Sequence, residues 1–252
     1  MKILTIGTLL ISLSATLSVA LEDGAQDMKP EDTEVWEGEP KRVSGSLDRS
    51  PPSDAILLFD GKSLSQWVSK ADGSAASWTI EKGVMTVRPG AGDIKTKLKF
   101  KDVQLHIEWR SPEGEDHRTG QDKGNSGVFL QERYEVQVLN SYKNRTYSNG
   151  QAASVYKQTI PLANATAKTG EWNVYDIFYT APRFHEDGSL KTSAFVTVMH
   201  NNVLVQNHTE IKGETVYIGA PFYKAHGAAS LMLQDHSNKV SYRNIWVRPL
   251  AE

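Results

Sequence analysis

Beyond residue 55 the chain alternates short apolar runs with turn residues, and no segment carries a long apolar repeat of 3.6 residues. The runs are rich in Val, Ile, Tyr, Phe and Trp, which favour strands. Asn201-Asn202 predicts a type I′ hairpin between its flanking runs. The predicted strands are Ile56 to Phe59, Trp78 to Ile80, Val84 to Val87, Val103 to Arg110, Ser126 to Gln131, Tyr134 to Leu139, Ala153 to Tyr156, Asn173 to Thr180, Ala194 to His200, Val203 to Gln206, Ala229 to Gln234 and Val240 to Arg248.

Strands that follow one another without crossover helices are expected to pair in the antiparallel sense, because parallel neighbours need long connections. The sequence contains no repeat of fixed period, which argues against a propeller or a β-helix. We therefore expect an all-β domain over residues 54–252, built as a sandwich of two antiparallel sheets packed face to face.

The first twenty residues differ from the rest of the chain. Lys2 is followed by an apolar run from Ile3 to Val19, and small residues at Ser18 and Ala20 suit cleavage by signal peptidase. Residues 1–20 are therefore interpreted as a signal peptide, which predicts a periplasmic or secreted protein. No later stretch approaches the roughly 20 apolar residues of a membrane-spanning helix, so no membrane insertion is expected after cleavage.

Charge separates an N-terminal arm, residues 21–53, from the predicted domain. Residues 21–54 hold ten acidic and four basic residues, whereas residues 55–252 hold twenty acidic and twenty-three basic ones. The arm has few apolar residues and four prolines, which predicts an extended segment. Trp36 is its exception, and this side chain either anchors the arm to the domain or contacts a ligand.

Composition excludes several functions. A net charge of −2 gives no broad basic field for binding nucleic acid. Without cysteine there is no disulfide, thiolate zinc site or cysteine nucleophile. The default assembly is a monomer, with a weak homodimer through exposed sheet edges as the alternative.

Three predicted strands carry unusual polar residues on the face opposite their apolar residues. Glu, Gln, His and Arg at alternate positions are atypical of a merely solvated strand, although that interpretation stays open. If these faces line one concave groove, sugars are the natural ligand, because amides and charged groups pair with hydroxyls and aromatic rings stack on pyranose faces. The polar residues are His106, Glu108 and Arg110, then Arg133, Glu135 and Gln137, then Gln234 and His236.

Five strings, in this order, resemble the 3-keto-disaccharide hydrolase family over residues 54–250. They are Leu58-Phe59-Asp60-Gly61-Lys62-Ser63-Leu64 with Trp67, Asn125-Ser126-Gly127-Val128-Phe129-Leu130, Tyr134-Glu135-Val136-Gln137-Val138, Gly170-Glu171-Trp172-Asn173, and Leu233-Gln234-Asp235-His236 with Tyr242-Arg243-Asn244-Ile245. The resemblance implies a concanavalin-like jelly-roll sandwich. It also implies a carbohydrate substrate, a glycoside oxidised to a ketone at C3.

A C3 ketone acidifies the C2 hydrogen and places the C1 leaving group β to the carbonyl. One base can therefore drive elimination through an enolate, and addition of water then completes hydrolysis. Such a site needs a general base over C2, donors at the C3 oxygen and an acid at the glycosidic oxygen.

Glu135 is the first candidate for the base, with Glu108 and His236 as alternatives, because burial can shift each pKa toward neutrality. The remaining candidates would orient hydroxyls, stabilise the enolate or otherwise contact the sugar. They are Arg133, Gln137, Gln234, Arg243, Asn125, Tyr156 and Trp36.

A divalent metal is an open alternative as a cofactor. His106 and Glu108 could share an ion, and His185-Glu186-Asp187 could hold calcium, but neither has a specific ligand spacing.

Two other functions remain open. A non-catalytic, lectin-like module would use the same fold and aromatic residues. A conventional retaining glucanase would need a second carboxylate, but Gln137 and Asn140 follow Glu135 where that pattern requires Asp and Glu.

Overall fold

The computed structural model describes residues 28–45, 50–115 and 117–250. The predicted signal peptide, residues 1–20, lies outside the described residues. The described part of the chain divides into one unit that ends at Arg42 and a second that begins at Val43. The first unit contains the 3-10 helix η1 (Pro30–Thr33), where the Lys29 N–H donates to Asp32 Oδ2 at 2.9 Å.

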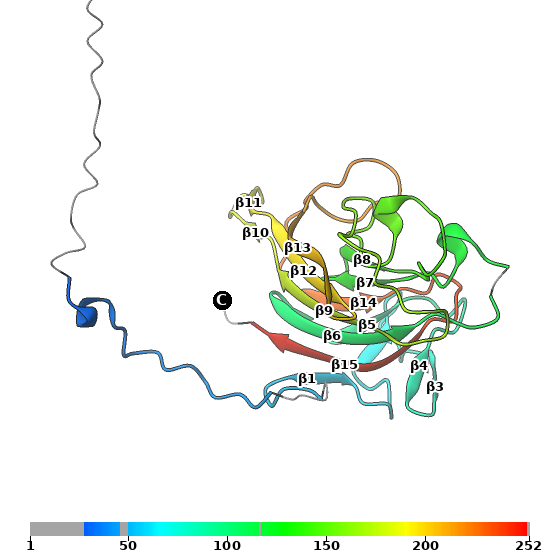
Figure 1. Cartoon of the computed structure of the whole chain (residues 1–252), viewed down its shortest axis with the longest axis horizontal. Coiled ribbons are helices and arrows are strands. Elements are labelled where there is room, and N and C mark those ends of the chain that lie inside the picture. Colours follow the sequence, from blue (N-terminus) through cyan, green and yellow to red (C-terminus); the bar gives the residue numbers. More distant parts are fainter. Residues whose placement is uncertain (1–27, 46–49, 116, 251–252) are drawn as a thin grey trace, which may run out of the picture. The chain divides into compact units, whose positions relative to one another are not determined.

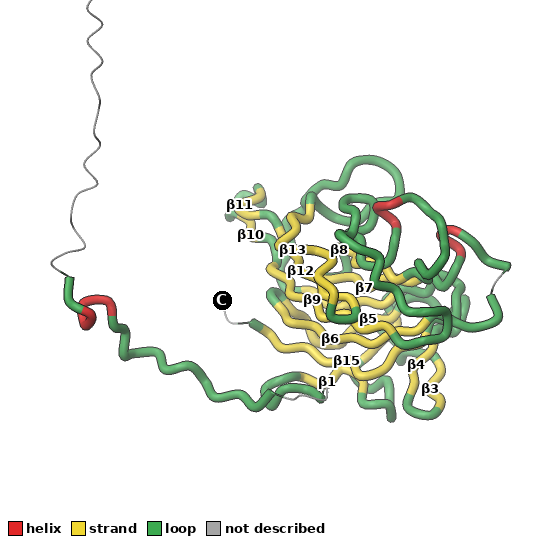
Figure 2. Tube along the Cα trace, in the orientation of Figure 1, coloured by secondary structure: helices red, strands yellow, loops and turns green. Residues whose placement is uncertain are grey.

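The second unit is a sandwich of two antiparallel sheets (Figures 1 and 2). The eight-stranded sheet has the order β13 (Val203–Ile211), β12 (Ala194–His200), β9 (Asn173–Thr180), β6 (Val103–Arg110), β15 (Ser241–Pro249), β4 (Val84–Thr86) and β3 (Thr79–Glu81), with β1 (Ile56–Phe59) paired to β15. The five-stranded sheet has the order β2 (Trp67–Ser69), β5 (Ile94–Phe100), β14 (Ala229–Leu233), β7 (Ser126–Leu130) and β8 (Tyr134–Val138). A separate hairpin pairs β10 (Arg183–Phe184) with β11 (Leu190–Thr192), and two short 3-10 helices, η2 (Gly120–Asp122) and η3 (Ser148–Gly150), lie in loops.

The expected all-β sandwich is therefore confirmed, and several strands have the predicted bounds. Asn201 and Asn202 have φ of 51° and 65° between paired His200 and Val203, as a type I′ turn requires. The predicted strand Ala153 to Tyr156 is wrong, because only an isolated bridge between Val136 and Val155 forms there. Strands β2, β5, β10 and β11 were not predicted.

The core lies between the sheets. It includes fully buried tyrosines whose hydroxyls link one sheet to the other. Tyr242 Oη donates to Ser126 Oγ at 2.6 Å, and Ser126 Oγ donates to the Gln234 carbonyl at 2.6 Å. Tyr175 Oη donates to the Gln137 carbonyl at 2.9 Å. Because these bonds end on the Ser126 side chain in β7 and on backbone carbonyls of β8 and of the residue after β14, they fix the five-stranded sheet from its inner side.

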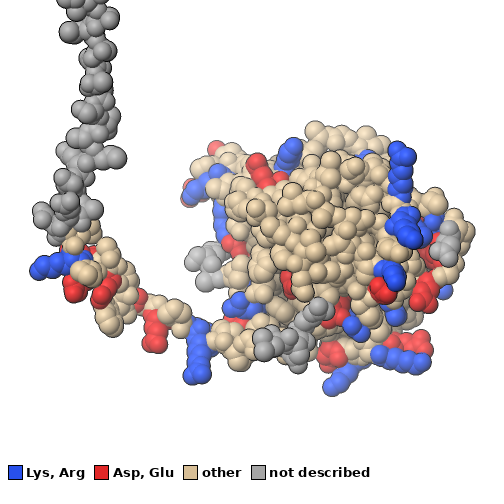
Figure 3. All heavy atoms as spheres, viewed as in Figure 1, with Lys and Arg blue, Asp and Glu red and all other residues tan. Residues whose placement is uncertain are grey.

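No helix in the described residues is long and apolar enough to cross a membrane. On the face of the sandwich seen in Figure 3, basic and acidic side chains are interspersed around a central area that carries few charges.

Candidate functional site

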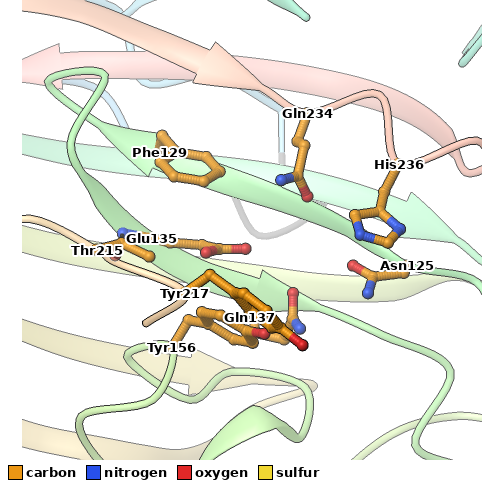
Figure 4. A pocket seen from close by; sticks show the side chains of 9 residues that line it. All are labelled: Asn125, Phe129, Glu135, Gln137, Tyr156, Thr215, Tyr217, Gln234 and His236. Carbon is orange, nitrogen blue, oxygen red and sulfur yellow. Dashed lines mark hydrogen bonds between the residues drawn. The ribbon is translucent and has the colours of Figure 1, made fainter. Parts of the chain in front are cut away.

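Strand β8 alternates core residues with polar residues that point away from the core. Tyr134, Val136 and Val138 are buried between the sheets, so Glu135 and Gln137 project from the other face of the five-stranded sheet. They open into a cavity of about 290 Å³ (Figure 4). The other lining residues are Asn125, Phe129, Tyr156, Thr215, Tyr217, Gln234 and His236.

Two loops attach to the free edge of β8 and form one wall of this cavity. The Tyr156 N–H donates to the Glu135 carbonyl at 3.1 Å, and the Glu135 N–H donates to Thr215 Oγ1 at 3.0 Å. The Thr215 N–H in turn donates to the Arg133 carbonyl at 2.9 Å. The edge of the sheet is therefore covered by the same loops that carry Tyr156 and Tyr217.

Glu135 is the buried acidic group of the cavity. Only 4% of the residue is exposed, and the structure records no hydrogen bond to its carboxyl from the described residues. Burial, with a smaller contribution from the negative charge of Asp93, raises the pKa of Glu135 to about 8. Once ionised, such a carboxylate is a much stronger base than an ordinary glutamate.

Gly127 makes room for this carboxyl. A Cβ at Gly127 would lie 2.6 Å from Glu135 Oε1 and 2.7 Å from the Phe129 ring, which is closer than real contacts allow. The residue sits inside strand β7, opposite Gln137, and not in a turn. A larger residue here would therefore displace the Glu135 carboxyl or the Phe129 ring.

Two buried amide oxygens in the cavity have no partner among the described residues, Gln137 Oε1 and Gln234 Oε1. The Gln137 amide is fixed from behind, where its Nε2 donates to Gln121 Oε1 at 3.0 Å. Asn125 Nδ2 donates to the Gln121 carbonyl at 2.6 Å, so η2 supports both side chains. Unpaired buried acceptors are costly to the fold, so each of these two oxygens would gain from a hydrogen-bond donor.

His236 lies at the exposed mouth of the cavity. The turn that follows it is held by other groups, since Asp235 Oδ1 accepts the Ser237 N–H at 2.9 Å and Asn238 Nδ2 donates to the His236 carbonyl at 2.8 Å. The imidazole itself is not used to hold the turn.

Arg133 immediately precedes β8 and does not line the same cavity as Glu135. Its Nε donates to Glu214 Oε1 at 2.9 Å and its Nη1 donates to the Gln131 carbonyl at 2.8 Å. It borders a separate cavity of about 450 Å³ with Lys70 and Lys99 among its lining residues. The expectation that Arg133 joins Glu135 in one site is therefore not supported, because a local carboxylate engages the guanidinium.

Glu108 and Arg243 are likewise placed elsewhere, on the outer side of the eight-stranded sheet. The prediction that the polar faces of all three strands line one groove is wrong, because β6 and β15 belong to the other sheet. Alternation along a strand identifies the face that points away from the core, but a sandwich has two such faces.

Glu108 is held there in an ion-pair network. Its Oε2 accepts Arg243 Nε at 2.6 Å, and its Oε1 accepts Asn244 Nδ2 at 3.0 Å. Burial alone would raise the pKa of Glu108, but the hydrogen bonds that it accepts, with His106 the largest contributor, lower that pKa to about 2. His106 Nδ1 lies 2.6 Å from Asp176 Oδ1. These contacts occupy the groups that were considered for sharing a metal ion.

The other predicted ligand positions also have local partners. Trp36 is 85% exposed, and its Nε1 donates to Glu34 Oε2 at 3.0 Å within the N-terminal unit. In the segment from His185 to Asp187, Asp187 Oδ1 accepts the Ser189 N–H at 2.8 Å, which closes the β10–β11 turn. No group of three or more His, Asp or Glu residues suited to a metal ion occurs in residues 28–45, 50–115 and 117–250.

Sequence reasoning missed Phe129, Thr215 and Tyr217 as cavity residues. Phe129 could have been found, because it lies two residues after Gly127 on the same strand face. Thr215 and Tyr217 lie in a loop more than 75 residues from β8 in sequence, and no local pattern connects them to it.

Fold and cavity together define a β-sandwich protein with a polar, aromatic-walled site suited to a sugar. Residues 54–248 match the model of the 3-keto-alpha-glucoside-1,2-lyase-like domain family. The chain belongs to this family, as the resemblance in its motifs predicted.

Among similar proteins, a 3-keto-disaccharide hydrolase from Bacteroides thetaiotaomicron is 27% identical over 247 residues, which cover 79% of this chain and 80% of the relative. The crystal structure of a glycosyl hydrolase candidate from Parabacteroides distasonis is 52% identical, with a TM-score of 0.84, and covers 90% of this chain and 99% of its own. A second such structure from that organism, 20% identical with a TM-score of 0.56 over 79% of this chain and 94% of its own, shares the fold. This chain accordingly has a glycoside hydrolase-type function.

Proposed function

We propose that this enzyme cleaves glycosides carrying a ketone at C3, and that Glu135 starts the reaction by removing the C2 proton. The observation that supports this most directly is the buried Glu135 carboxyl, which has a pKa raised to about 8 and faces a sugar-sized polar cavity. A C2 hydrogen next to a ketone is acidic enough for such a carboxylate to remove, whereas the same hydrogen in an unoxidised sugar is not.

The neighbouring side chains suit recognition of the oxidised ring. Gln137 and Gln234 line the cavity, and side-chain amides pair well with sugar hydroxyl groups. The amide N–H groups of Gln234 and the His236 ring supply donors for the C3 oxygen as it becomes an enolate. Phe129, with Tyr156 and Tyr217 opposite, gives aromatic surface for the pyranose ring (Figure 4).

The same cavity does not favour a conventional retaining mechanism. Such a mechanism needs two carboxyl groups about 5 Å apart, and among the nine residues that line this cavity only Glu135 carries one. Asp93 is not a lining residue, and its Oδ1 accepts the Asp235 N–H at 3.0 Å while its Oδ2 lies 3.4 Å from Lys70 Nζ.

The test is product analysis by mass spectrometry after incubating the full chain with a disaccharide and, in parallel, with its 3-keto derivative. Cleavage of the oxidised sugar alone, releasing 3-ketoglucose or its unsaturated precursor, is expected. Cleavage of the unmodified disaccharide would contradict the proposal in favour of an ordinary glycosidase. Binding without cleavage of either sugar would contradict it in favour of a lectin-like role.

Gly127→Ala is expected to lower kcat/KM for the 3-keto sugar about 10²-fold, because the new methyl group displaces the Glu135 carboxyl from its position. Steady-state kinetics of the folded variant measure this. Gly227→Ala is the matched control, since a Cβ there meets nothing within 4 Å. Equal kinetics for the two variants would show that the position of the carboxyl is not critical.

A further inference from the structure

Tyr156 lies directly across from Glu135, although Tyr156 belongs to a loop and Glu135 to strand β8. The antiparallel bridge between Val136 and Val155 puts Glu135 opposite Tyr156, and the Tyr156 N–H donates to the Glu135 carbonyl at 3.1 Å. Directly opposed residues in an antiparallel pair point to the same face, with Cβ atoms about 5 Å apart. Both side chains therefore enter the cavity side by side (Figure 4).

The Tyr156 hydroxyl is hydrogen bonded to a second phenol. Its Oη lies 2.6 Å from Tyr147 Oη, and the 39% exposed Tyr147 connects the pair to solvent. Lys157 Nζ lies 5.7 Å from the centroid of the Tyr147 ring and donates to the Tyr217 carbonyl at 2.7 Å, so both cavity loops are tied at this point. Burial raises the pKa of Tyr156, which keeps this phenol protonated.

We propose that Tyr156 is the general acid that protonates the departing glycosidic oxygen, and that Tyr147 positions its hydroxyl. This inference rests on the proposed 3-keto-glycoside cleavage. Glu135 removes the C2 proton and the C2–H electron pair forms the enolate. The enolate collapses to a C1=C2 double bond as the C1–O bond breaks, and that oxygen takes the Tyr156 proton.

Hydration reverses these transfers and restores both residues. The Tyr156 phenolate takes a proton from water as the oxygen of water bonds to C1, and the new enolate takes back the C2 proton from Glu135. The sum is one 3-keto glycoside and one water converted to a 3-keto sugar and an alcohol. Tyr147 stabilises the phenolate in between by donating its hydrogen bond.

The location of Tyr156 favours it over His236 for this role. The base acts at C2 and the acid at the oxygen on C1, which are adjacent positions on the sugar, so the two groups must reach neighbouring atoms of one bound ring. Tyr156 is the direct cross-strand neighbour of Glu135, whereas His236 follows β14 and lies at the exposed mouth.

The test compares Tyr156→Phe with the unmodified enzyme on two 3-keto-glucosides, one with a sugar leaving group and one with a nitrophenyl leaving group. A nitrophenolate departs without protonation, so only the sugar leaving group requires the acid. We expect kcat/KM to fall about 10²- to 10⁴-fold for the 3-keto-disaccharide and less than about 10-fold for the nitrophenyl substrate. Tyr147→Phe is expected to show the same selectivity with a smaller loss.

Tyr142→Phe, outside the cavity, controls for the substitution itself, and thermal unfolding verifies that each variant is folded. Equal losses on both substrates in Tyr156→Phe would overturn the inference, since the hydroxyl would then contribute to binding alone. If the unmodified enzyme cleaves neither 3-keto substrate, the proposed function fails and this assignment fails with it.

Discussion

Replacing Glu135 with glutamine is expected to lower cleavage of a 3-keto-disaccharide by at least about 10³-fold while sugar binding persists. Glutamine has the same shape and fills the same buried position, but it cannot accept the C2 proton. Steady-state kinetics give the loss of kcat/KM, and calorimetric titration with the 3-keto sugar under conditions where it is not turned over gives the affinity. Loss of both cleavage and affinity would indicate that Glu135 acts in binding.

Circular dichroism and thermal unfolding are the control for this variant, because they verify that it is folded. A folded Glu135→Gln protein that cleaves the substrate at the original rate would remove Glu135 from the role of base. His236→Ala would then be measured next, because His236 is the other proton acceptor in the cavity.

The same carboxyl predicts opposite pH trends for activity and stability. The proposed reaction needs the ionised form, so kcat/KM is expected to rise with pH up to about 8, the pKa of Glu135. Between pH 4.5 and 8 the folded state holds a proton that the unfolded state releases, so stability falls as pH rises, by up to ~5 kcal/mol in total. In Glu135→Gln this part of the decline is expected to disappear, which thermal unfolding at pH 5, 7 and 9 measures.

Alternation of side chains predicted the core-facing and outward residues of β8, and therefore placed Glu135 and Gln137 together. It could not assign strands to sheets, because each outward face of a sandwich shows the same pattern. Glu108 was therefore grouped with residues that lie on the other sheet.

Strand β5 and the contact of Thr215 show what local sequence patterns can and cannot predict. Strand β5 alternates Lys95, Lys97 and Lys99 with mostly apolar residues, and this alternation is by itself typical of a strand. The contact of Thr215 with the edge of β8 depends on a loop closing over a long sequence separation, and only tertiary structure reveals it.

The second large expected effect concerns the Glu108 network on the opposite sheet. Replacing Glu108 is expected to lower the stability of the fold and to leave the Glu135 cavity in place. The Glu108 carboxylate is buried between the Arg243 guanidinium and the His106 ring. Removing one partner of a buried pair leaves the other charges uncompensated, at a cost of about 3–5 kcal/mol, which the half-exposed position of Arg243 reduces. Glu108→Gln is therefore expected to unfold with ~2–3 kcal/mol less free energy and a Tm lower by about 5–10 °C.

The pH dependence of this effect follows from both partners. Glu108 has a lowered pKa, so its contribution is present above pH 4.5 and is lost as pH falls toward 2. For His106, burial lowers the pKa but the hydrogen bonds to Asp176 and Glu108 outweigh it, so its contribution is full below pH 6.5 and is lost as pH rises through the raised pKa. The difference between Glu108→Gln and the unmodified protein is expected to be largest between pH 4.5 and 6.5. Denaturant unfolding across this range measures it, with exposed Glu81→Gln as the control. A variant that is as stable as the control but loses sugar cleavage would instead place Glu108 in catalysis, against its position on the other sheet.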